Sequence, residues 1–228
     1  MKRLLHAINV FYQVLLFFLP WKIRRYCLKW VYGWFLHPDC YIGYSIINAK
    51  SVALDRNARI GHFNICKRID CLTLGEYSGI GNLNKITGFP TNDSSVYHFK
   101  HVKNRKCELI IGSHTGITSN HYFDCNAGIY IGSYTQVAGF GSAFMTHSID
   151  VVESIQDANP IVIGDYCFIG ARCMVLKGVR ICDKCVVSAM SLVNKDLLQE
   201  ESLFGGVPAK YLKTLEHAKF FYRKEGAI

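Results

Sequence analysis

Proline and acidic residues are both scarce in this chain of 228 residues. It has 5 proline and 19 glycine residues, which excludes collagen-like and proline-rich composition. Half of the residues are hydrophobic, so neither a disordered tail nor a small disulfide-knotted protein fits. The length suits one enzyme-sized domain with a substantial core.

The first 36 residues contain no acidic residue at all. They hold six basic residues, namely Lys2, Arg3, Lys22, Arg24, Arg25 and Lys29, out of a formal net charge of +9 for the whole chain. Residues 37–228 therefore carry only 9 − 6 = +3. This distribution favours a basic segment that faces anionic lipid, and it argues against nucleic acid as a partner.

The same segment is rich in apolar residues. Residues 4–21 form an apolar stretch of about 18 residues, just long enough to cross a bilayer, but basic residues flank it on both sides. Residues 23–34 then place apolar side chains at helical spacing with Arg24, Arg25 and Lys29 between them. We expect residues 1–36 to form a helical leader that lies on or re-enters a membrane. The alternative is a helix that docks on the body of the protein or on a sister subunit.

The ten cysteines are irregularly spaced and follow no secretory signal. The one Cys-x-x-Cys pair, Cys182 and Cys185, lacks a second pair at a zinc-ribbon distance. We expect reduced thiols in a cytoplasmic protein and no bound metal.

Ile-Gly pairs recur along the chain, several of them 18 or 20 residues apart. From Ile163 an aliphatic residue follows at every sixth position: Ile169, Val175, Ile181, Val187 and Val193. Four positions after each of the six comes a residue that is small in most cases: Cys167, Cys173, Val179, Cys185, Ser191 and Leu197. A helix requires a period of 3.6 and a strand a period of 2, so a period of six predicts a triangular coil with both sets pointing inward.

Two polar, aperiodic segments interrupt the repeat, residues 88–107 and residues 144–160. Insertions into a solenoid project from it, and function tends to reside there. We expect residues 88–107 to help to recognise an acceptor substrate.

The pattern [LIV]-G-x-x-[small]-x over residues 40–212 resembles the hexapeptide-repeat acyltransferase family. The ending Gly205-Gly206-Val207-Pro208-Ala209-Lys210 is similar to the G-x-P-A-[KR] signature of these enzymes. The resemblance implies an all-β fold, a left-handed parallel β-helix of hexapeptide repeats over residues 37–213, despite the usual right-handed crossover. Residues 214–228 are expected to form a short C-terminal helix that caps the open end.

The resemblance also implies an acetyl-CoA-dependent O-acetyltransferase that modifies a sugar hydroxyl of a surface polysaccharide or its lipid-linked precursor. His147 in the second insertion is the expected general base, because imidazole titrates near neutral pH. Asn120, His121 and Asp124 come about one coil earlier and are candidates to orient the base or to stabilise the oxyanion. His121 also stands four residues after Ile117, which would make it an inward, structural residue.

In the family the coenzyme lies in a groove between subunits, so the resemblance implies a homotrimer. Carried over by position, the coenzyme-binding residues are Ala171, Ala189, Asn194, Lys195, Gly206, Pro208, Lys210 and Lys213. Lysines suit phosphate as mobile point charges. The leader would hold the enzyme peripherally at the inner face of the plasma membrane, beside lipid-linked glycans.

Two alternatives remain open. One is a scaffold without catalysis that uses the β-helix as a spacer. The other is a zinc hydratase of the same fold, with His62, His114 and His121 as ligands, although His114 and His121 are seven residues apart and that family needs about five.

Overall fold

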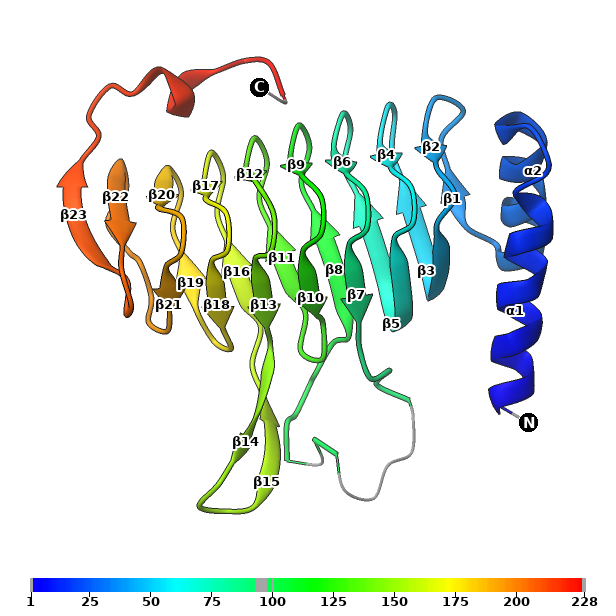
Figure 1. Cartoon of the computed structure of the whole chain (residues 1–228), viewed down its shortest axis with the longest axis horizontal. Helices are drawn as coiled ribbons and strands as arrows, with labels where there is room; N and C mark the ends of the chain where they lie inside the picture. Colours follow the sequence, from blue (N-terminus) through cyan, green and yellow to red (C-terminus); the bar gives the residue numbers. More distant parts are fainter. Residues whose placement is uncertain (1, 93–97, 100, 227–228) are drawn as a thin grey trace.

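The computed structural model describes residues 2–92, 98–99 and 101–226, with side chains from residue 7 onward. The described chain forms a row of stacked coils with two helices at one end (Figure 1). The all-β left-handed parallel β-helix that the family resemblance implies is confirmed.

Each coil contributes one strand to each of three faces. On the first face, each strand pairs in parallel with the strand one coil further along. In spatial order these are β2 (Tyr41–Ile42), β4 (Arg59–Ile60), β6 (Gly79–Ile80), β9 (Gly116–Ile117), β12 (Gln136–Val137), β17 (Phe168–Ile169), β20 (Cys185–Val187) and β22 (Ser202–Gly205). The register keeps the Ile-Gly isoleucines in line, since Ile42 pairs with Ile60 and Ile60 with Ile80.

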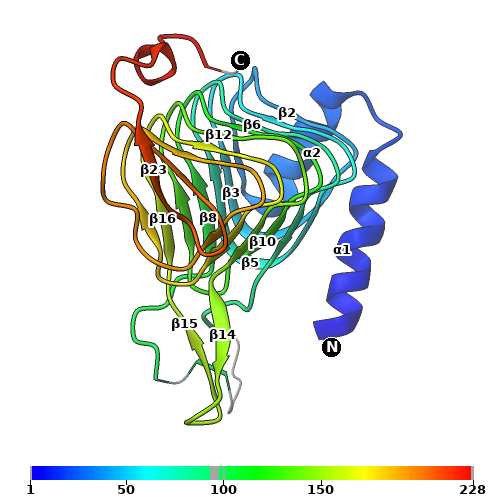
Figure 2. The same ribbon diagram turned by 60° about the vertical axis from the view of Figure 1, so that its left-hand side comes forward.

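The other two faces are joined because β3 (Ile46–Leu54) and β5 (Ile65–Leu74) each continue around a corner. The second face continues with β7 (Lys85–Thr87), β10 (Tyr122–Asp124), β13 (Ala143–Met145), β18 (Met174–Leu176) and β21 (Leu192–Val193). The third face holds β1 (Phe35–Leu36), β8 (Glu108–Ile111), β11 (Ile129–Ile131), β16 (Ile161–Ile163) and β19 (Arg180–Ile181). Viewed more nearly along the axis of the β-helix, the stacked coils outline a rounded triangle (Figure 2).

The interior is filled by the two residue sets that the hexapeptide period predicts to point inward. All six aliphatic residues from Ile163 to Val193 are buried, and so are the residues four positions after each. Cys167, Cys173 and Cys185 occupy this small inward position as free thiols. Burial raises the pKa of the Cys167 thiol to about 12, so these cysteines act as compact apolar fillers.

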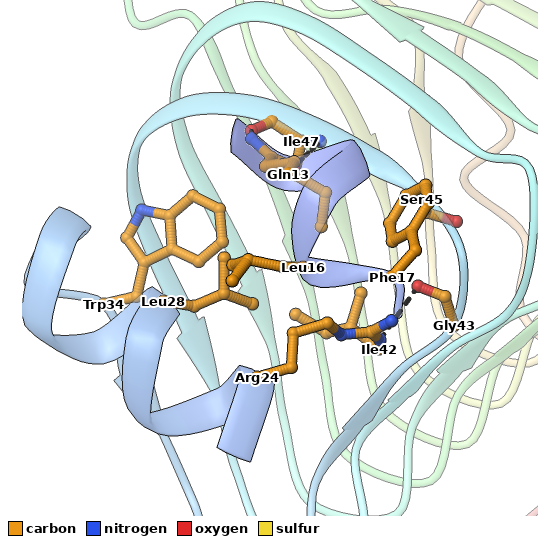
Figure 3. Close-up of a pocket in the computed structure, with 10 residues that line it drawn as sticks. All are labelled: Gln13, Leu16, Phe17, Arg24, Leu28, Trp34, Ile42, Gly43, Ser45 and Ile47. Carbon is orange, nitrogen blue, oxygen red and sulfur yellow. Dashed lines mark hydrogen bonds between the residues drawn. The ribbon is translucent and has the colours of Figure 1, made fainter. Parts of the chain in front are cut away.

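The leader closes the first end of the β-helix. Helix α1 (Lys2–Leu16) and helix α2 (Trp21–Tyr32) lie across the first coil. The Gln13 amide donates to the Ile47 carbonyl at 2.7 Å and accepts from the Ile47 N–H at 2.9 Å. Arg24 donates to the Gly43 carbonyl at 3.1 Å (Figure 3). These two side chains therefore satisfy backbone groups on the outer edge of the first coil, which has no further coil beside it on that side.

The orientation of α2 corrects one expectation. Arg24 and Arg25 are buried against the body, with Arg25 bonded to the Leu36 carbonyl, rather than on a lipid-facing side with Lys29. Leu16, Leu28 and Trp34 pack beside Arg24 around a cavity of about 10 Å³, which offers room for one water molecule at most. The helices are therefore a tightly packed end cap.

No helix within the described part of the chain is long and apolar enough to span a membrane. Helix α1 ends at Leu16, and a turn separates it from α2.

The C-terminal segment differs from a helix over the open end. Strand β23 (Lys210–Thr214) pairs antiparallel with β22 and covers that end. The helical part is a single 3₁₀ turn, η1 (Lys219–Tyr222), and the chain runs back along the coils (Figure 1). Phe221 is buried there, and Arg223 donates to the Tyr134 carbonyl. An antiparallel strand supplies hydrogen bonds to the last edge directly, which a helix cannot do.

Candidate active site

Both insertions leave the β-helix at the corner between the second and third faces. The first, residues 88–107, lies between β7 and β8, and the second begins after β13 and forms a hairpin of β14 (His147–Asp150) and β15 (Ile155–Ala158). The buried Thr146 fixes the start of the hairpin, because its hydroxyl donates to the Asp124 carbonyl at 2.6 Å and accepts from the Ala127 N–H at 3.0 Å. His147 therefore projects from a fixed point of the coil.

The His147 and Asp124 side chains form a hydrogen-bonded pair at this corner. Asp124 is 1% exposed, and its Oδ2 accepts from His147 Nδ1 and, at 3.2 Å, from the His147 backbone N–H. Asn126 donates to the other carboxylate oxygen. The bond to Asp124 raises the pKa of His147 above its ordinary value, and it outweighs the opposing effects of burial and of Lys177.

This arrangement has a clear chemical consequence. With its Nδ1 proton donated to a buried carboxylate, neutral His147 carries its lone pair on Nε2. A partly exposed imidazole held in one tautomer by a carboxylate is the arrangement that a general base requires.

The described part of the first insertion packs against the same imidazole. Phe99 is buried and lies edge-on to the His147 ring, with centroids 6.0 Å apart. The Arg105 guanidinium lies 4.8 Å from the Phe99 ring and donates to the Phe89 and Asn126 carbonyls at 2.6 Å. Arg105 thereby ties the insertion to the coil, and Phe99 shields one side of His147 from water.

The structure brings only Asp124 of the three candidate partners to His147. His121 points into the coil, where its Nε2 pairs with the Thr118 hydroxyl at 2.9 Å and its Nδ1 accepts from the Ser142 N–H at 3.1 Å. Burial lowers the pKa of His121 to about 4. Asn120 is an exposed corner residue with φ 61°, and its backbone bonds to Asn82 and Gly141. His121 therefore has a structural position, and Asn120 is exposed at the corner between the first and second faces. Neither lies beside the imidazole.

Asn126, Phe99 and Arg105 were not predicted from the sequence. Asn126 stands two residues after Asp124, and a polar pair at the end of a coil beside an insertion is the signal that could have found it. Phe99 and Arg105 lie in an aperiodic segment, where the sequence has no register that would place them.

The corner between the first and second faces changes character along the coils. In the early coils a corner side chain accepts the N–H of the preceding corner residue: His62 from Tyr44, Asn82 from His62, and Ser119 from Asn82. The later coils have Gly139, Ala171 and Ala189 at these positions, which have no side-chain acceptor. Ala171 lies directly against Gly139, whose added Cβ would come within 2.5 Å of the Ala171 Cβ. The late corner is thus formed by small residues that offer no side-chain acceptor to the neighbouring backbone N–H groups.

The remaining candidate coenzyme residues lie at the same end of the β-helix. Gly206 and Pro208 are exposed in the turn between β22 and β23, and the Gly206 carbonyl accepts from the Leu192 N–H at 3.0 Å. The other candidates are exposed on or near the last strands: Asn194, Lys195, Lys210 and Lys213. Two of the predicted residues, Ala171 and Ala189, thus line the corner, and Lys210 and Lys213 stand beyond its end on β23. Asn194 and Lys195 follow β21 at the other corner, between the second and third faces.

Among the described residues no group of three or more His, Cys, Asp or Glu side chains could hold a metal ion. The three histidines of the hydratase alternative have separate roles. His62 accepts from the Tyr44 N–H, His114 stacks between Tyr77 and Tyr134 at 5.1 and 4.7 Å, and both ring nitrogens of His121 are bonded.

Comparisons with known proteins agree with this fold. A family model described as the hexapeptide repeat of succinyl-transferase matches residues 160–192. A chloramphenicol acetyltransferase of Klebsiella aerogenes is 33% identical over 109 residues, which cover 46% of this chain and 51% of that protein. A 2,3,4,5-tetrahydropyridine-2,6-dicarboxylate N-succinyltransferase of Thiobacillus denitrificans is 44% identical over 64 residues, 26% of this chain and 23% of the relative.

Among solved structures, the polysialic acid O-acetyltransferase OatWY superposes with a TM-score of 0.58 at 16% identity, covering 80% of this chain and 84% of that one. At this identity the likeness concerns the fold. The chain spans about half the length of the chloramphenicol acetyltransferase and less of the succinyltransferase.

The strand pairing and the matched repeat show that this chain contains a β-helix of hexapeptide repeats. Its resemblance to the hexapeptide-repeat acyltransferases is confirmed by the matched repeat and by the relatives.

Proposed function

We propose that the protein is an acetyl-CoA-dependent O-acetyltransferase that acts on a sugar hydroxyl. The observation that carries the proposal is the His147–Asp124 pair, a base held in one tautomer where two insertions meet on a hexapeptide β-helix. Its relatives include an acetyltransferase and a succinyltransferase, which supports acyl transfer as the reaction class.

In this reaction His147 Nε2 takes the proton from the acceptor hydroxyl as its oxygen attacks the thioester carbonyl. The new C–O bond forms, the C–S bond breaks, and the proton passes from His147 to the departing thiolate to give free coenzyme A. Asp124 stabilises the imidazolium that forms between the two transfers. General-base catalysis of this kind contributes about 10²–10⁴ in rate.

We infer that the late corner holds the pantetheine arm of acetyl-CoA. Backbone N–H groups without side-chain acceptors suit amide carbonyls of an extended chain, and Gly139, Ala171 and Ala189 leave room for it. Lys210 and Lys213 stand on β23, beyond the end of the corner, where phosphates would extend.

The late corner and His147 lie at opposite ends of β13, so the width of the second face of the β-helix separates them within a chain. We therefore propose a homotrimer in which the corner of one chain faces His147 of its neighbour.

The acceptor is proposed to be a sugar of a surface polysaccharide or of its lipid-linked precursor. A solved structure of the same fold is named as a polysialic acid O-acetyltransferase, which supports a glycan acceptor. The ten free cysteines suit the reducing cytoplasm, where acetyl-CoA is available.

The test is release of free coenzyme A thiol from acetyl-CoA in the presence of a panel of sugars and lipid-linked glycans. Acceptor-dependent release by the wild type that disappears in His147→Ala, with unchanged melting temperature, is the expected result. Ala189→Glu should raise KM for acetyl-CoA at least tenfold. Leu198→Glu, which adds the same charge at an exposed position off the corner, should leave it unchanged.

If acetyl-CoA neither loses its acyl group nor raises the melting temperature, the protein is not an acetyltransferase, and the scaffold alternative replaces it.

A further inference from the structure

The two leader helices each have one face packed on the coils and an opposite face that is apolar and exposed. On α1, Gln13 and Leu16 are buried, whereas Phe11, Val14 and Leu15 are exposed. Phe18, in the turn that follows α1, is 85% exposed. These residues recur at spacings of three and four, so they share the helix face that points away from the β-helix.

Helix α2 has the same division. Arg24, Arg25 and Leu28 are buried against the first coil. Ile23, Tyr26 and Trp30 are exposed on the opposite side, and Trp30 is 88% exposed. We call the surface formed by Phe11, Val14, Leu15, Phe18, Ile23, Tyr26 and Trp30 the end face.

We propose that the end face is a membrane-docking surface that inserts into an anionic lipid leaflet. Exposed apolar surface of this extent marks an interaction site. Tyr and Trp among its residues favour the boundary between headgroups and acyl chains, where an amphipathic ring is half wet.

The charges around the end face identify lipid as the occupant. Lys22 and Lys29 are exposed on α2, beside the apolar residues, and the first 36 residues contain no acidic side chain. Exposed lysines next to an apolar helix face, with no acidic side chains among them, are attracted by the negative surface potential of an anionic lipid leaflet. Two identical cationic end faces would repel each other, which disfavours a second copy as the occupant.

The buried arginines make this docking rigid. Arg24 and Arg25 donate to carbonyls of Gly43 and Leu36, so α2 cannot leave the coil without exposing those bonds. The surface therefore belongs to the folded body rather than to a detachable anchor. This proposal goes beyond the acetyltransferase reaction and does not depend on it.

The experiment is flotation of the purified full chain with vesicles of phosphatidylcholine alone and with vesicles that also contain phosphatidylglycerol. We expect binding to the anionic vesicles only. The double variant Phe18→Gln/Trp30→Gln should lose at least tenfold in affinity. Each of Lys22→Ala and Lys29→Ala should lose about fivefold, an effect that disappears at high salt.

The matched control is Val151→Gln/Val152→Gln, which removes two apolar side chains that are 84% and 86% exposed at the distant hairpin tip. It should bind vesicles like the wild type. Absence of binding to either vesicle, or equal loss in the control, overturns the proposal. So does a dimer that forms without lipid and is abolished by Phe18→Gln/Trp30→Gln. Acetyl transfer to a water-soluble acceptor should be equal in all variants, which separates this test from that of the reaction.

Discussion

Replacing the buried Asp124 by asparagine changes one charge and almost no volume. In the wild type the carboxylate accepts the Nδ1 proton of His147, and Asn126 donates to its other oxygen. An asparagine keeps its oxygen toward Asn126 and turns its NH₂ toward His147. His147 Nδ1 must then accept, which leaves the proton on Nε2, where the acceptor hydroxyl needs a lone pair.

The expected loss follows from the bond that is removed. A hydrogen bond to a charged group contributes about 1.5–3 kcal/mol. At about 1.4 kcal/mol per factor of ten, this alone lowers kcat/KM by roughly tenfold to a hundredfold, and the unfavourable tautomer adds to it.

The pH profile gives an independent readout. Asp124 raises the pKa of His147 above its ordinary 6.5, and only the neutral imidazole accepts a proton. In the wild type kcat/KM should therefore rise with pH through a midpoint above 6.5. In Asp124→Asn the midpoint should move to lower pH while the plateau falls.

The assay is coenzyme A release from pH 5 to 9 at saturating acetyl-CoA and varied acceptor concentration, which gives kcat/KM for the acceptor, with the melting temperature measured alongside. Asp150→Asn is the control, because that carboxylate accepts the backbone N–H groups of Val152 and Glu153 at the hairpin turn and asparagine can accept them too. An Asp124→Asn protein that keeps both the plateau and the midpoint would refute the role given to Asp124.

Three further predictions concern stability and thiol chemistry. His121→Ala should lower the unfolding free energy by about 1–3 kcal/mol by leaving a buried amide unpaired, while kcat of the folded protein stays unchanged; a selective loss of kcat would contradict the structural role. Arg24→Met should lower the free energy of unfolding, measured with denaturant, by about 1.5–3 kcal/mol. Lys22→Met, at an exposed position, should change it by no more than about 0.5 kcal/mol, and equal effects of the two substitutions would refute the end-cap role. In the native protein a thiol reagent should react fastest at the partly buried cysteines, and all ten thiols should react after denaturation; rapid native reaction of all ten would show that the core is open. The partly buried cysteines are Cys27, Cys71 and Cys182.

The period of six was sufficient to predict the β-helix, because each repeat places its residues in the same environment. Ile169 and Cys167, for instance, are both fully buried, as their positions in the repeat predict. The interruptions of the period were equally informative, since they located the two insertions that meet at His147.

The orientation of the leader could not be read from its periodicity. Helical spacing separates two faces of α2 but does not say which one is covered. Arg24 is buried because the first coil presents free carbonyls, and that edge is visible only once the coil exists. The partners of His147 divide in the same way. Asp124 follows from the coil spacing, whereas Phe99 reaches the imidazole from an insertion without register.

The constant spacing of the coils also fixes the distance between the active-site corner and the end face. Asp124 pairs with Thr87, Thr87 with Lys67 and Lys67 with Asn48, which lies in the strand that α1 covers. Three strand spacings of about 4.8 Å and one helix layer of about 10 Å put Asp124, the partner of His147, about 25 Å from the end face. If that face rests on lipid as proposed, the enzyme acts at a set height, and a lipid-linked glycan would be modified on sugars several units from its anchor. Inserting or deleting one complete coil between Asn48 and Asp124 would then shift the modified unit along the glycan.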